Sequence, residues 1–252
     1  MTVHFVGAGP GAPDLLTLRG QRLIAASPVC LYAGALVPSE ILGHCPAHAR
    51  VVDTRDLTLD EIIAELRAAD TAGMDVARLH SGDVSIWSAA AEQIRRLESL
   101  GIPYDVTPGV PAFAAAAALL GRELTLPGVA QTVILTRHAS RSTPMPPGEE
   151  LASLAAHGTT LVLHLAVQAI DEVVAALRPS YAAETPVAVV ARASWPDELV
   201  LRGTLETIAE AVRDAGVRRT AVILVGRALA APGFRDSHLY SSERRRPARE
   251  GM

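Results

Sequence analysis

Three glycines follow the first apolar segment of the chain. Residues 3–16 read VHFVGAGPGAPDLL, so Gly7, Gly9 and Gly11 come directly after a run of apolar and β-branched residues. A glycine-rich turn after a strand lets the backbone approach a ligand, and in dinucleotide-binding proteins it cradles a pyrophosphate at a helix N-terminus. The first chemistry to test is therefore nucleotide-cofactor binding, and the alternative is a close-approach turn for a different ligand.

The surroundings of the glycine loop argue against a dinucleotide. A nicotinamide or flavin site needs an acidic residue about 20 positions on, at the end of the next strand, to hold the ribose. The next strand-like segment, VCLYAG at 29–34, ends without an acid, and the next one along the chain is Glu40. Pro10 also removes a backbone donor from the loop. The loop is therefore expected to serve another ligand.

No metal is expected from the few residues that could hold one. Cys45 lies beside His44 and His48, but no second cluster at ligand spacing completes a site, so a loop at a helix end is the preferred interpretation. Cys30 lies in an apolar run and is expected in the core. All 23 basic residues are arginine, and this absence of lysine excludes a pyridoxal Schiff base and a P-loop lysine.

Composition predicts a globular protein. The 252 residues are 49% hydrophobic and 20% charged, which is enough for a sizeable core, and the net charge is −4. That charge gives no indication of a nucleic-acid or membrane-surface partner. No apolar run reaches the ~18–20 residues that span a bilayer. The N-terminus has no basic segment before an apolar one, so no signal peptide is predicted, and a cytoplasmic location is expected.

Strand-like and helix-like segments alternate and predict two α/β domains. In the first half, strands are expected at 3–8, 29–34, 49–53, 74–80 and 103–109, with helices at 61–70, 89–101 and 109–121. In the second half, strands are expected at 130–137, 159–166, 185–193, 198–205 and 220–228, with helices at 151–158, 169–178 and 205–216. The predicted domains are 1–120, with a mostly parallel sheet, and 121–240, with a mixed sheet because SWPDELVLRG suggests antiparallel strands, followed by a flexible tail at 241–252.

Several blocks together resemble one enzyme family. The segments 5–37 (FVGAGPGAPDLLTLRG onward), 78–97 (RLHSGDVSIWSAAAEQIRRL), 103–124 (PYDVTPGVPAFAAAAALLGREL) and 159–166 (TTLVLHLA) resemble the motifs of the tetrapyrrole (corrin/porphyrin) methyltransferases, in order, over about residues 3–228. LYAGALVP at 31–38 and the segment 115–141 most resemble the precorrin-4 C11-methyltransferase branch of cobalamin synthesis. Gly34 and Ala35 stand where the siroheme branch carries an aspartate and an arginine, and the absence of lysine also argues against that branch.

The resemblance implies methyl transfer from S-adenosylmethionine to a ring carbon of a small-molecule tetrapyrrole. The sulfonium donor is already activated, so orientation supplies most of the catalysis and no metal is required. The family also implies a homodimer and an active-site cleft between the two domains. Carried over by motif, the S-adenosylmethionine pocket comprises Pro10, Ser81, Gly82, Asp83, Ile86, Pro111, Ala112, Leu165, Ala193 and Ala221. Pro111 replaces a usual hydroxyl residue, and Leu165 a frequent methionine.

Two of these positions also have ordinary structural interpretations. Gly82 can be a simple turn, and Asp83 the N-cap of a helix that begins with VSIWSAAAEQI. Pro108–Gly109 is likewise an ordinary turn signal. Under the resemblance, the three glycines of the first loop, Gly7, Gly9 and Gly11, instead line the trough that holds the macrocycle, where their backbone approaches its flat face.

Substrate carboxylates are expected to meet arginines, because a guanidinium binds a carboxylate bidentately. Arg137 and Arg141 lie in a polar, proline-containing segment at 137–150 that could form a lid, and further candidates are Arg19, Arg55 and Arg122. The general base is not identified; Asp105 and Glu123 are weak candidates, and His80 ends a strand.

The sequence leaves open other members of this methyltransferase family and proteins of other functional classes. Among members they are a C17 or C20 methyltransferase of the corrin pathway, a cobalt-precorrin-4 C11-methyltransferase, a uroporphyrinogen-III C-methyltransferase, and diphthine synthase. From other classes they are a non-catalytic tetrapyrrole carrier and a nicotinamide oxidoreductase. A carrier would bind the macrocycle without S-adenosylmethionine, and an oxidoreductase would bind its cofactor at the glycine loop.

Overall fold

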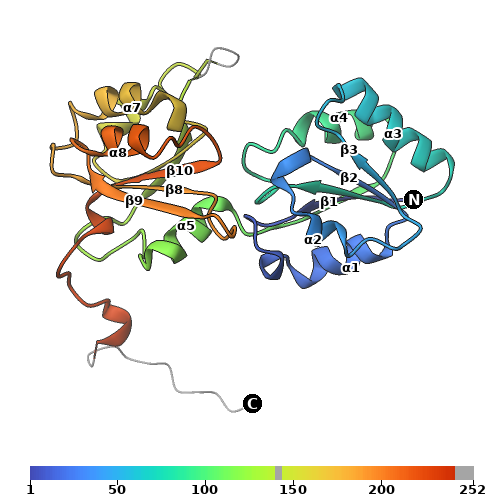
Figure 1. Cartoon of the computed structure of the whole chain (residues 1–252), viewed down its shortest axis with the longest axis horizontal. Helices are drawn as coiled ribbons and strands as arrows, with labels where there is room; N and C mark the ends of the chain where they lie inside the picture. Colours follow the sequence, from blue (N-terminus) through green and yellow to red (C-terminus); the bar gives the residue numbers. More distant parts are fainter. Residues whose placement is uncertain (140–143, 242–252) are drawn as a thin grey trace. The chain divides into compact units, whose positions relative to one another are not determined.

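The first part of the chain forms a parallel sheet. The computed structural model describes residues 1–139 and 144–241. The strands β1 (Val3–Gly7), β2 (Val29–Tyr32), β3 (Arg50–Asp53), β4 (Val76–His80) and β5 (Tyr104–Thr107) lie in the order β3-β2-β4-β1-β5 (Figure 1). Every pairing in this sheet is parallel.

Helices cover both faces of this sheet. Figure 1 shows α1 (Leu18–Ala26) and α2 (Ser39–Leu42) on one face, and α3 (Leu59–Thr71) and α4 (Ala91–Leu100) on the other. Side chains alternate along β1: Phe5 packs in the cluster of α3 and α4, whereas Val6 packs with Ile24 of α1. Strands buried on both faces explain the nearly continuous apolar runs in the sequence.

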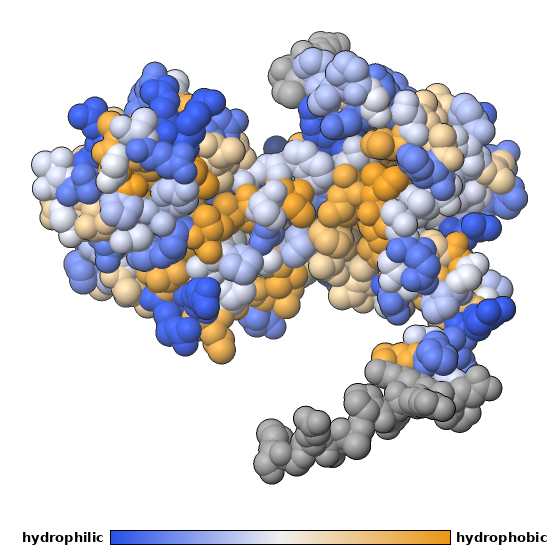
Figure 2. All heavy atoms as spheres, turned by 180° about the vertical axis from the view of Figure 1, so that it is seen from behind, coloured by the Kyte–Doolittle hydropathy of each residue, from blue (hydrophilic) through white to orange (hydrophobic). Residues whose placement is uncertain are grey.

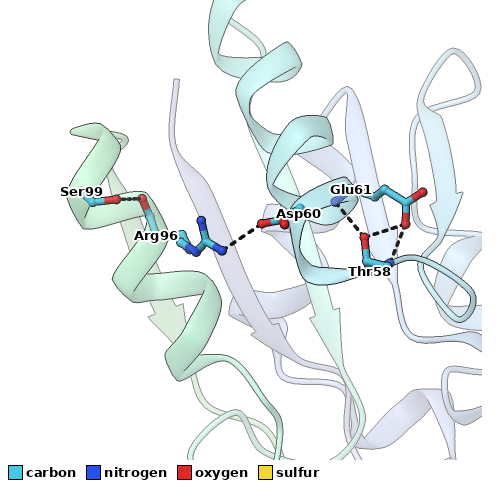
Figure 3. A network of polar contacts seen from close by, with 5 residues as sticks. All are labelled: Thr58, Asp60, Glu61, Arg96 and Ser99. Carbon is cyan, nitrogen blue, oxygen red and sulfur yellow. Dashed lines mark hydrogen bonds and ion pairs between the residues drawn. The ribbon is translucent and has the colours of Figure 1, made fainter.

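Polar contacts join α3 to α4 at the surface (Figure 3). Thr58 and Glu61 form a capping box, in which the Thr58 hydroxyl accepts from the Glu61 amide and the Glu61 carboxylate accepts from the Thr58 amide. Arg96 of α4 donates to Asp60 Oδ1 at 2.8 Å. These contacts fix the start of α3 and the spacing of the two helices.

The second part of the chain forms a mixed sheet. The strands β6 (Val133–Arg137), β7 (Thr160–His164), β8 (Pro186–Ala191), β9 (Leu199–Thr204) and β10 (Ala221–Val225) lie in the order β6-β7-β10-β8-β9. β6 and β7 are parallel, whereas β10 is antiparallel to β7 and β8. The predicted fold class, two α/β domains with a parallel first sheet and a mixed second one, is confirmed.

The helices of the second part pack on its sheet around one core. They are α6 (Leu151–Ala155), α7 (Ile170–Leu177) and α8 (Ile208–Asp214). α5 (Ala112–Leu120) follows β5, and short 3₁₀ turns lie at Pro13–Leu15, Gly34–Leu36, Val167–Ala169, Arg227–Leu229 and His238–Tyr240. No helix in the described ranges is long and apolar enough to cross a membrane.

The chain divides into two compact units by its contacts. The first comprises Met1–Leu119 and Arg192–Leu199, and the second comprises Leu120–Ala191 and the chain from Val200. The sequence assigned all of 121–240 to the second domain, but the structure groups the β8–β9 connection Arg192–Leu199 with the first unit. Figure 2 shows apolar surface interspersed with hydrophilic surface on the face that it draws.

Candidate functional site

The motif loops lie at the switch point of the first sheet. β1 and β4 are neighbours, and the chain leaves β1 toward α1 on one face but leaves β4 toward α4 on the opposite face (Figure 1). In open α/β sheets, ligands bind outside the carboxyl ends of such strands. The glycine loop follows β1 and the SGD motif follows β4, so the topology brings both motifs to the expected ligand-binding edge.

Backbone hydrogen bonds join these two loops directly. Gly9 N donates to Gly82 O at 3.1 Å, and Gly82 N donates to Gly9 O at 2.7 Å. Ala8 N donates to His80 O at 2.7 Å. The pairing of β1 and β4 therefore continues past the strand ends, and it fixes Gly82 beside the glycine loop.

Glycine is required here by contacts within the protein. A Cβ on Gly7 would stand 2.5 Å from Gly109 N, and a Cβ on Gly109 would overlap Gly82 O. A Cβ on Gly11 would overlap the indole of Trp195. Gly9 has a left-handed φ of +79°. The structure thus gives Gly7 and Gly11 a packing reason and Gly9 a conformational one, and the macrocycle trough stays a prediction.

Asp83 ties the β4 loop to the β5 loop. Its Oδ2 accepts from Gly109 N at 2.8 Å, and its Oδ1 accepts from Ser85 N at 2.8 Å and from the Ser85 hydroxyl. Partial burial raises the pKa of Asp83, but these hydrogen bonds outweigh it and leave the pKa below its usual value. The helix-cap interpretation is wrong, because α4 begins only at Ala91; Asp83 instead closes a turn as an ionised side chain.

The β8–β9 connection contacts the glycine loop. Trp195 Nε1 donates to Pro10 O at 2.8 Å, and Ala12 N donates to Ser194 Oγ at 2.9 Å. The Arg192 guanidinium lies 4.3 Å from the centre of the Trp195 ring and donates to Asp197 Oδ1 at 2.5 Å. No sequence pattern indicated the contacts of Trp195 with Pro10 and of Ser194 with Ala12, which join residues more than 180 positions apart.

The non-glycine residues with left-handed backbone lie in sequence at or near predicted donor-binding residues. Six non-glycine residues in the described part of the chain have φ between 46° and 69°: Trp87, Ala89, Leu165, Arg192, Ser194 and Thr220. Leu165 is itself a predicted pocket residue, and the others lie one to three residues from Ile86, Ala193 or Ala221. Such conformations cost about 1–3 kcal/mol each and concentrate at functional sites. The left-handed residues therefore lie in or next to predicted donor-binding segments, and the assignment of those segments to the donor stays a prediction.

The predicted donor-binding residues are divided between the units. In the first unit, Gly82 lies beside the start of α5, because its Cβ would stand 3.8 Å from Pro111 Cα and from Ala112 N. The contacts above place Gly82 and Asp83 beside the segments that carry Pro10, Pro111 and Ala112, and the neighbours of Ala193 contact the glycine loop. Ser81 and Ile86 belong to the same unit. Leu165, 72% exposed after β7, and Ala221, the first residue of β10, belong to the second unit.

The arginine candidates have mixed surroundings. Arg137, at the end of β6, donates to His138 O at 3.3 Å and to Pro144 O at 3.1 Å, so it anchors the segment that follows it. Arg141 lies outside the described residues. Arg55 pairs with Asp53 at 3.0 Å, whereas Arg19 and Arg122 are exposed. The carboxylate clamp stays a prediction.

The candidate bases do not lie in the loop cluster. Asp105 Oδ2 lies 2.9 Å from His4 Nδ1, and these two residues face each other along β5 and β1 before the strands end. Glu123 is exposed and accepts from the Thr125 hydroxyl at 3.1 Å. His80 is at the edge, but burial and then the nearby charge of Arg78 lower its pKa to about 3, so its ring is neutral.

Two further polar residues lie buried beneath the β4 loop. Arg78 of β4 and Gln93 of α4 are 4% and 3% exposed, and Arg78 Nε donates to Gln93 Oε1 at 2.9 Å. The sequence carried one signal for this pair, an arginine inside the apolar run MDVARLH.

Among the described residues, no group of three or more His, Cys, Asp or Glu could hold a metal ion.

Comparison with known proteins assigns the family. The model for Tetrapyrrole (Corrin/Porphyrin) Methylases matches residues 2–209, most of the chain. The chain is a tetrapyrrole methylase. This tetrapyrrole methylase is 63% identical, over 246 residues, to a Rhodococcus erythropolis protein named precorrin-4 C(11)-methyltransferase, with 98% of this chain and 99% of that one aligned. The resemblance to this family, and to its precorrin-4 branch, is confirmed.

Two solved structures share the fold of this tetrapyrrole methylase. A cobalt precorrin-4 methyltransferase superposes with a TM-score of 0.88 at 38% identity, covering 90% of this chain and 95% of that one. A uroporphyrin-III C-methyl transferase from Thermus thermophilus, complexed with S-adenyl homocysteine, superposes with a TM-score of 0.78 at 30% identity, covering 92% and 100%. The second relative binds the demethylated form of the methyl donor.

Proposed function

We propose that the protein transfers a methyl group from S-adenosylmethionine to C11 of precorrin-4, in cobalamin synthesis. The observation that carries this proposal is the 63% identity, over nearly the whole chain, to a relative named for that reaction. The uroporphyrin-III methyltransferase, at 30% identity, is a weaker match. Gly34 in place of the siroheme-branch aspartate favours the same choice, and it has a left-handed φ of +53° with the Arg55 side chain against it.

The reaction asks little of side-chain chemistry. The ring carbon supplies an electron pair to the methyl carbon, the methyl–sulfur bond breaks, and its electrons stay on sulfur as S-adenosylhomocysteine leaves. The protein must align the sulfonium methyl with C11 and exclude water, and orientation alone contributes several kcal/mol to such steps. A donor pocket of backbone groups and small side chains suits this task, and so does the cluster around Pro10, Gly82, Asp83, Pro111 and Ala193.

The first domain is proposed to hold both ligands. Its glycine loop would line the macrocycle trough, and the SGD and GVPA segments would hold the donor. The second domain would complete the donor pocket with Leu165 and Ala221 and bind substrate carboxylates with Arg137 and Arg141. A homodimer follows from the family, and a sedimentation mass near twice 26.5 kDa would support it.

Mass spectrometry of precorrin-4 incubated with the enzyme and S-adenosylmethionine tests the proposal. We expect a gain of one methyl group, located at C11 by NMR, and the same assay with cobalt-precorrin-4 identifies the preferred form. A gain only on uroporphyrinogen III, or only on an earlier or later corrin precursor, would assign another member of the family. Binding of the macrocycle without binding of S-adenosylhomocysteine would instead identify a carrier and contradict the proposal.

A further inference from the structure

The exposed segment after the SGD motif is held in an unfavourable conformation. Trp87 and Ala89 have φ of 46° and 53°, and they flank Ser88. Neither residue is glycine, so both pay the steric cost of left-handed backbone. Trp87 and Ala89 are exposed. The backbone of the segment has hydrogen-bond partners in the protein beneath it, and these can hold the conformation.

Hydrogen bonds from two buried side chains hold the carbonyls of Ser88 and Ala89 in this turn. His80 Nδ1 lies 3.0 Å from Ser88 O, and Gln93 Nε2 donates to Ala89 O at 3.0 Å. The neutral His80 ring must carry its proton on Nδ1 to make this bond, because a carbonyl only accepts. His80 and Gln93 are each 3% exposed. The two donors come from β4 and α4, elements with fixed positions in the core.

The support for Gln93 continues into the sheet. Gln93 Oε1 accepts from Arg78 Nε at 2.9 Å, and Arg78 Nη1 donates to Thr54 Oγ1 at 3.0 Å. Thr54 Oγ1 in turn donates to Tyr32 O at 2.9 Å. Arg78 makes no ion pair with a carboxylate among the described residues. A buried guanidinium without a counter-ion is expensive. A contribution to stability therefore does not explain why an arginine is buried at this position. Its hydrogen bond to Gln93 Oε1, which orients the Gln93 amide, does explain it.

We propose that Arg78, Gln93 and His80 are positioning residues that hold the Trp87–Ala89 turn in its left-handed form, so that residues 81–86 are shaped for the methyl donor. This inference rests on the proposed function, because it assigns the segment to donor binding. If the turn relaxes, only a fraction of the molecules remains competent, and the apparent dissociation constant rises by the inverse of that fraction.

The variant Gln93→Glu separates positioning from stability. A glutamate still accepts from Arg78 and gives it a counter-ion, but it has no amide hydrogen for Ala89 O. We expect the unfolding temperature to be unchanged or higher, the amides of residues 84–90 to exchange faster with deuterium, and S-adenosylhomocysteine to bind on the order of tenfold more weakly by calorimetry. Gln131→Glu, at an exposed position of the second unit, is the charge-matched control.

A pair at His80 supplies a second test. His80→Asn keeps a donor close to the place of Nδ1, whereas His80→Leu removes it. We expect the asparagine variant to retain the slow exchange of residues 84–90 and the affinity for S-adenosylhomocysteine, and the leucine variant to lose both. Gln93→Glu remains decisive if the leucine variant fails to fold.

The outcomes distinguish the two levels of the inference. Unchanged exchange in Gln93→Glu would overturn the role of the buried residues in holding the turn. Faster exchange with unchanged affinity would overturn the link to the donor. If the wild-type protein binds no S-adenosylhomocysteine, the proposed function fails, but the exchange experiment still decides whether these residues hold the turn.

Discussion

Left-handed backbone beside a predicted donor-binding residue is held in two different ways in the first unit. The Trp87–Ala89 turn, next to Ile86, is held from beneath by His80 and Gln93, both 3% exposed. The Arg192–Ser194 turn, around Ala193, is instead held by partly exposed contacts of its own connection and the glycine loop.

The difference teaches where each turn is vulnerable. The side chains of His80 and Gln93 are buried in low dielectric, so losing a partner leaves a desolvated group unpaired at high cost. At the other turn, the contact of Arg192 with Asp197 is exposed, so water can replace it and salt screens it. Substitutions that release the Trp87–Ala89 turn should therefore also destabilise the core. Substitutions in the β8–β9 connection should instead lower the stability by small, independent amounts.

The largest effect on stability is expected at Thr54, a buried residue that bonds to Arg78. Thr54→Val keeps the shape of the side chain but removes both the acceptor for Arg78 and the donor to Tyr32 O. We expect a loss of about 2–3 kcal/mol in the free energy of unfolding, measured with urea, because a charged donor is left unsatisfied. Thr71→Val, at an exposed hydroxyl that donates to Arg67 O, should change it by less than about 0.5 kcal/mol. Equal losses for Thr54→Val and Thr71→Val would contradict the greater importance of buried hydrogen-bonding groups.

The second-largest effect on stability is expected from acid, through the buried ring of His80. The pKa of His80 is lowered to about 3 from 6.5, so between these values the unfolded chain binds a proton that the folded chain does not. Stability is then fully present above pH 6.5 and falls as the pH drops, by about 1.4 kcal/mol per pH unit from this residue.

His164, whose pKa burial lowers to about 4, acts in the same direction. The His80→Asn variant isolates the His80 contribution: between pH 7 and pH 5 the wild type should lose about 2 kcal/mol more than this variant. Parallel pH profiles for the two proteins would show that His80 is not held neutral.

A smaller effect is expected at Trp195. Trp195→Phe keeps an aromatic ring beside Gly11 but removes the Nε1 donor to Pro10 O. One neutral, partly exposed hydrogen bond is worth about 1 kcal/mol, and we expect a loss of that order in urea unfolding. Hydrogen exchange should quicken in the glycine loop but not at residues 84–90. Faster exchange in both segments would mean that the two turns are coupled.

The smallest effect is expected at Asp197. Its carboxylate accepts from Arg192 at the surface, and this contact, opposed slightly by desolvation, lowers the pKa of Asp197. Asp197→Asn should shift the unfolding temperature least of the four changes, and 0.5 M salt should abolish the shift, because exposed pairs are screened. A shift that persists in high salt would indicate that the pair is shielded from solvent.

The sequence predicts elements well here and side-chain partners poorly. Each of the strands β1–β10 overlaps a predicted segment, because apolar runs bounded by turn residues are a local signal. The contact of Trp195 with Pro10 depends on how distant segments meet, and no local pattern encodes it. The motif residues of the first unit come from the resemblance, and the structure pairs Gly82 with the glycine loop and Asp83 with the loop after β5.

Asp83 and Asp105 illustrate the physical limit of such predictions. An aspartate before an apolar, alanine-rich segment is typical of a helix cap, but left-handed residues at 87 and 89 delay the helix to Ala91. Asp105, a weak candidate for the general base, faces His4 along the strand rather than the loops beyond the strand ends. In both cases the deciding factor is backbone geometry, which residue type alone does not fix.

The close approach of Gly7, Gly82 and Gly109 has a consequence for reading variation among relatives or in mutant libraries. A side chain at Gly7 or Gly109 has no room because backbone fills the space, whereas at Gly73 or Gly101 nothing lies within 4 Å. A library that samples every single codon change should therefore reject Gly7 and Gly109 substitutions as strictly as those at a reacting residue. The crossing of three chain segments is by itself enough to make these positions invariant, without any contact with the substrate.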